Sequence, residues 1–199
     1  MAIVLPTAPD EGMELIRRHV PSLLAAGGIT DVFDGADKAF FVARPQPIYT
    51  GTARDVVDRR ILAGANLTGW QYVILTDESV FAAAEIGNKE GKDEWAFTVL
   101  RFLGASRPIG EALNAAEELP EIDDADYELR ILRSPGVFLR ALWLHPLAGA
   151  NDLLIPIDRT PRGIKPNTKY TETELADALF ALAAARTAEP AFDLDKEIG

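Results

Sequence analysis

Residues 127–157, YELRILRSPGVFLRALWLHPLAGANDLLIPI, predict three consecutive β-strands joined by short connections. The middle segment, Val137 to His145, is apolar on nearly both faces, which is typical of a strand with other elements packed on each side. Consecutive strands with short connections favour an antiparallel meander. Pro156 has no N–H to donate to a ladder, so it indicates a strand end or an edge strand.

Further strands are predicted upstream of this stretch. Alternating apolar residues favour a hairpin formed by residues 70–75 and 79–86. Residues 95–103 have a length that suits a strand or a helix, and their Trp, Phe, Thr and Val content favours a strand. Residues 64–69 are expected to form a loop before the hairpin.

Two prolines follow another segment with strand character, residues 38–44. Proline cannot donate to a ladder and is rare in central strands. Pro45 and Pro47 therefore argue against a regular central strand that continues past residue 44.

Helical spacing of apolar residues predicts four helices, at 10–26, 53–62, 108–119 and 172–186. Thr50 or Thr52 can cap the second helix. Thr171 and Glu174 form the sequence pattern of a capping box for the last.

Strands and helices together predict an α+β fold, with a largely antiparallel sheet of about five or six strands and helices packed on it. A chain of 199 residues can bury about 70% of its unfolded surface, so it needs no metal or disulfide to fold. We expect a single domain over residues 1–186 and a flexible acidic tail over residues 187–199.

The charge balance limits the classes of partner. The chain carries 31 acidic and 20 basic residues, for a net charge of −11. Nucleic acids and anionic membrane surfaces require a basic footprint, so we expect neither as a partner. The chain has no cysteine, which excludes disulfides, a thiolate nucleophile and cysteine-ligated metals. That composition, with no signal-peptide pattern and no apolar run of membrane-spanning length, favours a cytoplasmic location.

Three residues of the middle strand are candidate ligand-binding residues: Arg140, Trp143 and His145. His145 ends the strand with Trp143 on the same face, and Asp152 can approach it across the following loop. Arg140 interrupts an apolar face, so it is expected to reach the sheet rim, to pair with an acidic group such as Glu128, or to anchor an anion. A purely structural role is the alternative for both Arg140 and His145.

Motifs for catalysis and cofactor binding are absent from the sequence. It contains no HExxH, no Walker loop, no GxGxxG that opens a helix and no GxSxG. The acidic segment 117–128 lacks the glycine and the later glutamate of a calcium loop. We therefore predict no catalytic residues, no metal site and no cofactor.

These observations favour a non-enzymatic accessory, adaptor or assembly protein that acts through protein–protein contacts. The first alternative is a small-ligand-binding protein or enzyme with a site near Arg140, Trp143 and His145. The second is an acidic inhibitor or immunity-type protein that covers a basic surface of its target. Homo-oligomerisation is compatible with each of the three.

Overall fold

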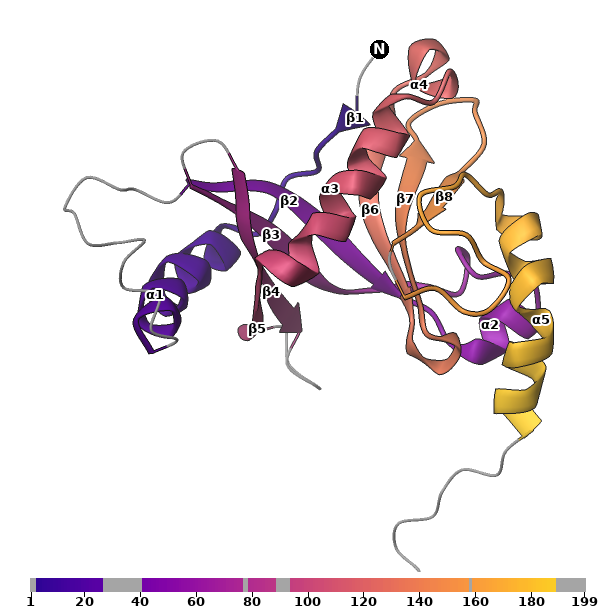
Figure 1. The fold of residues 1–199 in the computed structure, drawn as a ribbon, viewed down its shortest axis with the longest axis horizontal. Helices are drawn as coiled ribbons and strands as arrows, with labels where there is room; N and C mark the ends of the chain where they lie inside the picture. Colours follow the sequence, from indigo (N-terminus) through magenta and orange to yellow (C-terminus); the bar gives the residue numbers. More distant parts are fainter. Residues whose placement is uncertain (1–2, 27–40, 77–78, 89–93, 158, 189–199) are drawn as a thin grey trace, which may run out of the picture.

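The chain folds into one mostly antiparallel sheet with helices on both faces (Figure 1). The computed structural model describes residues 3–26, 41–76, 79–88, 94–157 and 159–188. Within these residues eight strands take the order β5-β4-β3-β2-β6-β7-β8, and β1 pairs with β6 beside that path. The predicted α+β class is confirmed, and the sheet has more strands than the five or six expected.

Along the chain, helices α3 and α4 separate strands β1–β5 from strands β6–β8. The strands are β1 Ile3–Val4, β2 Phe41–Thr50, β3 Asn66–Thr76, β4 Ser79–Asn88, β5 Trp95–Phe102, β6 Tyr127–Ser134, β7 Leu139–Pro146 and β8 Leu153–Pro156. The helices are α1 Asp10–Ala26, α2 Ala53–Val57, α3 Leu103–Glu117, α4 Glu121–Asp124 and α5 Glu172–Ala188, with a 3₁₀ turn, η2, at Pro135–Val137.

The stretch 127–157 forms the antiparallel meander that its sequence predicts. β6 pairs with β7 from Tyr127↔Pro146 to Ser134↔Leu139, and β7 pairs with β8. β8 ends at Pro156 and lies at the edge of the sheet, as its missing donor requires. Residues 95–102 form a strand, so that prediction is also confirmed.

Pro45 and Pro47 argue against a regular central strand, and the central strand that contains them is irregular. β2 runs through both prolines and lies between β3 and β6. The ladder with β3 shifts register between Ala43 and Gln46, so Pro45 falls at an irregularity. The parallel ladder with β6 begins at Ile48, so Pro47 precedes the first residue that pairs on that side. The two prolines, which lack an N–H donor, therefore lie where the ladder with β3 is irregular and before the ladder with β6 begins.

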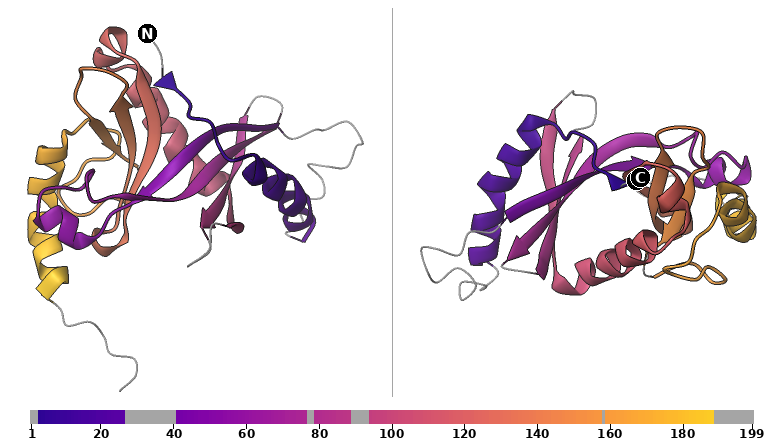
Figure 2. Two further views of the ribbon diagram at one scale, coloured as in Figure 1. Left: turned by 180° about the vertical axis from the view of Figure 1, so that it is seen from behind. Right: turned by 90° about the horizontal axis from the view of Figure 1, so that it is seen from above.

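Helices cover the two ends of the sheet separately, and Figure 2 shows α1 and α5 far apart. α1 packs Ile16 and Val20 against Tyr72 and its neighbours on β3 and β4. α3 crosses the opposite face and buries Ile109 and Ala112 against the β6–β8 end.

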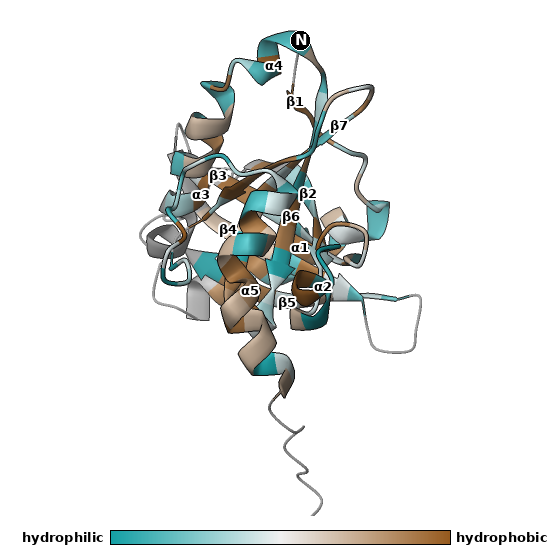
Figure 3. Cartoon of the chain, turned by 90° about the vertical axis from the view of Figure 1, so that its right-hand side faces the viewer, coloured by the Kyte–Doolittle hydropathy of each residue, from teal (hydrophilic) through white to brown (hydrophobic). Residues whose placement is uncertain are grey.

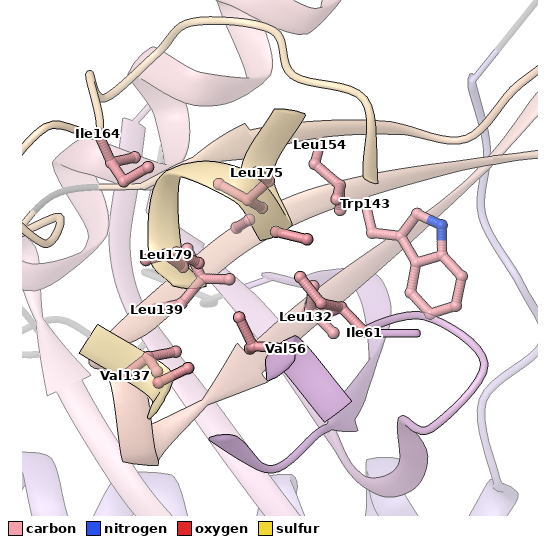
Figure 4. Close-up of a cluster of buried hydrophobic side chains, with 13 residues drawn as sticks. Val56, Ile61, Leu132, Val137, Leu139, Trp143, Leu154, Ile164, Leu175 and Leu179 are labelled. Carbon is pink, nitrogen blue, oxygen red and sulfur yellow. The ribbon is translucent and has the colours of Figure 1, made fainter. Parts of the chain in front are cut away.

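The face of β6–β8 turned away from α3 is covered by α2 and α5. Figure 4 shows the core between them, and Figure 3 shows the apolar strands behind α5. Its buried members are Val56, Ile61, Leu132, Val137, Leu139, Ala141, Trp143, Leu154, Ile164, Leu175, Ala176, Leu179 and Ala183. The sheet is thus buried on both faces at this end, as the apolar β7 sequence predicts.

Several element boundaries differ from the sequence prediction. α2 ends at Val57, well short of residue 62, because Arg59 adopts a left-handed conformation with φ 55°. Thr52 caps α2 through a capping box with Asp55. α3 begins at Leu103 and includes Pro108, and β3 begins at residue 66 within the expected loop.

The chain ends are only partly covered by the structure. α5 has the predicted capping box, in which Thr171 and Glu174 bond to each other's backbone N–H. The helix continues to Ala188, so the first two residues of the predicted tail are helical. The rest of that tail, residues 189–199, lies outside the described residues.

Candidate functional site

The three residues proposed from the sequence, Arg140, Trp143 and His145, all lie on β7 but do not form one group. Side chains alternate between the two faces of a strand, so Trp143 and His145 share one face and Arg140 lies on the other. Arg140 shares its face with Leu142, which packs under α3. The structure therefore brings Trp143 and His145 together and separates both from Arg140.

Trp143 and His145 converge on Asp152, which precedes β8. Trp143 Nε1 donates to Asp152 Oδ1 at 2.6 Å, and His145 Nδ1 lies 2.8 Å from the same oxygen. The expected approach of Asp152 is thus confirmed. The indole is almost fully buried, at 4% exposure, so the carboxylate satisfies a donor that water cannot reach.

An arginine stacks on the same aromatic group. The Arg130 guanidinium lies 5.0 Å from the Tyr49 ring centroid and 4.7 Å from that of Trp143, within cation–π range. Arg130 also donates to Glu128 at 2.6 Å. Glu128 therefore pairs with Arg130 and not with Arg140 as we predicted, because Glu128 and Arg130 project from the opposite face of the sheet. Each charge here has a partner, which indicates a structural cluster.

Asp152→Ala tests that structural role. We expect the free energy of unfolding to fall by about 1–3 kcal/mol, because the Trp143 Nε1 donor loses its acceptor in a buried position. Denaturation in urea measures the change. Asp152→Asn keeps one acceptor oxygen and is the matched control, with a smaller loss expected. Equal losses in the two variants would contradict the hydrogen-bond explanation.

A second cluster lies on the α3 face of the sheet, around Glu85 of β4. Glu85 is 3% exposed and accepts two bonds from Arg133, at 2.9 and 2.6 Å. Arg101 Nε lies 3.4 Å from Glu85 Oε1. Burial alone would raise the pKa of Glu85, but the Arg133 hydrogen bond and the neighbouring arginine charges hold that pKa below its usual value.

A chain of hydrogen bonds extends this cluster across the sheet. Arg140 donates to Gln71 Oε1, and Gln71 Nε2 donates to Gln46 Oε1 at 3.0 Å. Both glutamines are fully buried. Burial, with the positive charge of Arg133 close by, lowers the pKa of Arg140 to about 10, and Glu85 offsets only part of that shift. We refer to Gln46, Gln71, Glu85, Arg101, Arg133 and Arg140 as the arginine cluster.

Sequence reasoning found Arg140 but missed the other members of the arginine cluster. Their signal is a polar residue among apolar neighbours on one face of a strand, as for Arg133 beside Leu129 and Ile131 on β6. Gln71 and Glu85 oppose each other in the predicted hairpin, on the side away from Trp70 and Tyr72. Arg133 joins them only because β2 and β6 pair in parallel, and no short-range pattern indicates that pairing.

A third feature is the turn between β6 and β7. Phe138 follows η2 with φ 54° and is 62% exposed. Arg186 of α5 lies over its ring, 5.3 Å from the centroid. Within this turn Phe138, and not Gly136, takes the left-handed conformation. A bulky residue there costs about 1–2 kcal/mol.

Two cavities lie away from both the arginine cluster and Phe138. One of about 420 Å³ is bordered by Glu121, Tyr127 and Lys169, and one of about 190 Å³ lies beside α1. Among the described residues, no group of three or more His, Asp or Glu side chains is placed to hold a metal ion. In the same part of the chain no helix has the length and apolarity to cross a membrane.

The fold and these clusters define an α+β protein with a largely antiparallel sheet. Comparison with family models, with curated proteins and with solved structures gives no match.

Proposed function

We propose that the protein is a non-enzymatic accessory protein that binds another protein, and that Phe138 anchors the contact. The observation that carries this proposal is an aromatic side chain that is both exposed and held in a left-handed conformation. Such strain persists where the surrounding structure over-determines it, and it gathers at functional positions. Exposed aromatic residues that enter a partner's pocket are typical anchors of protein interfaces.

The turn that carries Phe138 is held firmly in place. Val137 is fully buried in the core between α2 and α5. A Cβ on Gly136 would lie 3.1 Å from Ala53 Cβ, so the turn packs closely on α2. A rigid turn presents the ring without the entropy cost of ordering a loop on binding.

The charge of the whole chain suggests the chemistry of the partner. A net charge of −11 produces a negative field that speeds encounter with a basic surface. The partner we propose is a protein with an apolar pocket for Phe138 and a basic surround.

The test is Phe138→Asn, because asparagine tolerates the left-handed conformation and removes the ring. We expect the free energy of unfolding to stay unchanged or rise by up to about 1 kcal/mol. Partner binding should weaken by at least about 30-fold, the loss typical of an anchor residue. Affinity capture from native lysate with the wild type and the variant identifies the partner, and calorimetry gives the two dissociation constants.

Phe180→Asn is the matched control, since Phe180 is an exposed aromatic residue on α5 with helical geometry. It should bind the partner as the wild type does. Equal capture by Phe138→Asn and wild type would refute the proposal. Binding that tolerates Phe138→Asn but weakens steeply with salt would instead support the acidic-inhibitor alternative.

A further inference from the structure

We propose that the arginine cluster binds an oxyanion, the carboxylate or phosphate group of a small ligand. This site lies on the α3 face of the sheet and does not involve Phe138. The inference therefore goes beyond the proposed protein contact and stands on separate residues.

The first argument is the local charge. Three guanidinium groups, those of Arg101, Arg133 and Arg140, gather near Glu85. Glu85 is the only acid found paired with them among the described residues. Within the part of the chain that the structure describes, two of these positive charges therefore have no acidic partner, although the chain as a whole has a charge of −11. An anion between the guanidinium groups would supply the missing charge.

The second argument comes from hydrogen-bond direction. Arginine can only donate, so Gln71 must turn its oxygen toward Arg140 and its nitrogen toward Gln46. Gln46 must then use its oxygen for Gln71, which leaves Gln46 Nε2 buried without an acceptor. Arg140 Nε is also buried and without an acceptor. The hydrogen-bonded series Arg140–Gln71–Gln46 therefore has an unused N–H donor at each end. Each buried donor without an acceptor lowers the stability of the fold by about 1–3 kcal/mol.

The third argument is access and shape. The side chain of Arg101 is 44% exposed and that of Arg133 is 23% exposed, so a solute can reach the cluster. Guanidinium forks match the paired oxygens of carboxylate and phosphate groups. α3 begins two residues after Arg101, so the partial positive charge of its N-terminus adds to the same field.

The experiment titrates the full chain with inorganic phosphate and, separately, with succinate. Ionic strength is held constant with chloride, and two-dimensional NMR and thermal melting report binding. We expect saturable shifts and a higher melting temperature with at least one probe. Arg140→Met and Arg101→Gln should each weaken that binding by about tenfold or more, because each removes a charge-assisted contact. If Arg140→Met fails to fold, the half-exposed Arg101 carries the test.

The matched control is Arg130→Gln, which removes an equally charged residue from the other face of the sheet. It should bind the probes as the wild type does. Binding of phosphate alone indicates a phosphorylated ligand, and binding of succinate alone indicates a carboxylate. Binding of neither probe, or an equal loss in Arg130→Gln, would overturn the inference. Phe138→Asn should leave probe binding unchanged, which separates this test from that of the protein contact.

Discussion

Gly12→Ala is expected to lower the free energy of unfolding by about 3 kcal/mol. Gly12 lies in the first turn of α1, where the helix approaches the sheet. An added Cβ would lie 2.0 Å from Tyr72 Oη and 2.7 Å from Ile86 Cδ1. Tyr72 and Ile86 are both buried in the core beneath α1, so neither side chain has space to move aside. The helix must shift away from β3 and β4, and the packing of Ile16 and Val20 is lost with it.

Denaturation in guanidinium chloride measures this loss, with Gly110→Ala as the matched control. Gly110 lies inside α3, and apart from its chain neighbours and the helix's own backbone no atom lies within 4 Å of its added Cβ. Alanine there should raise stability by about 0.5–1 kcal/mol through helix propensity alone. A Gly12→Ala variant as stable as the wild type would show that α1 does not pack this closely.

Tyr72→Phe sharpens the comparison, because it removes the atom nearest to the added Cβ. Tyr72 Oη is buried without a hydrogen-bond partner, and burial raises the pKa of Tyr72 to about 12. Loss of this hydroxyl should therefore cost little by itself. Combined with Gly12→Ala it should recover part of the lost stability. If the double variant is no more stable than Gly12→Ala, the steric conflict does not involve the Tyr72 hydroxyl.

The parts of the fold that the sequence predicts are those that depend on local patterns. The β6–β8 meander follows from alternation and short turns, and the capping box of α5 follows from the spacing of Thr171 and Glu174. The sequence of β7 predicts a buried strand because both of its faces are apolar, and helices cover both faces in the structure. Each of these inferences needs only residues that are neighbours along the chain.

The parts that the sequence does not predict depend on contacts between distant segments. Pro45 and Pro47 argue against a central strand until the position of β6 is known. The turn after β6 contains a glycine, yet the left-handed conformation falls on Phe138, because Val137 is fixed in the core. Arg140 was expected beside Glu128, and the face alternation of β6 assigns Glu128 to Arg130.

The candidate sites show the same division. Trp143, His145 and Asp152 are close in sequence, so their contact could be predicted. The arginine cluster takes one side chain from each of six strands, β2 to β7, so only the sheet order brings them together. In the sequence, these residues differ from their surroundings only as polar residues among apolar neighbours on one face of a strand.

Glu85→Gln is expected to lower the free energy of unfolding by about 3–5 kcal/mol. The substitution keeps the shape of the side chain and removes the only carboxylate found paired with Arg101 and Arg133 among the described residues. Breaking a buried ion pair from one side leaves the remaining charges uncompensated, which accounts for a loss of this size. Urea denaturation at neutral pH measures it.

Acid pH provides a second readout. The pKa of Glu85 in the folded protein lies below its ordinary value of 4.5. The carboxylate therefore contributes stability that is complete above pH 4.5 and is lost as the pH falls through the folded-state pKa. Glu85→Gln has no such carboxylate, so the difference in stability between wild type and variant should narrow in that range. A difference that stays constant on acidification would show that the loss comes from packing and not from charge.

Glu128→Gln is the control for any general effect of removing an acid. Among the described residues Glu128 pairs only with Arg130, and the two side chains are 22% and 16% exposed, so its loss should cost about 1 kcal/mol. An equal loss of unfolding free energy in Glu85→Gln and Glu128→Gln would show that the three arginines around Glu85 add nothing to its contribution to stability.

Phosphate should affect the two forms of the arginine cluster differently. With Glu85→Gln the three guanidinium groups have no carboxylate between them, so a bound anion replaces the charge that the substitution removed. The rise in stability at a given phosphate concentration should therefore be larger in Glu85→Gln than in the wild type. An equal or smaller rise would mean that phosphate does not bind beside Glu85, and the site would have to be sought elsewhere.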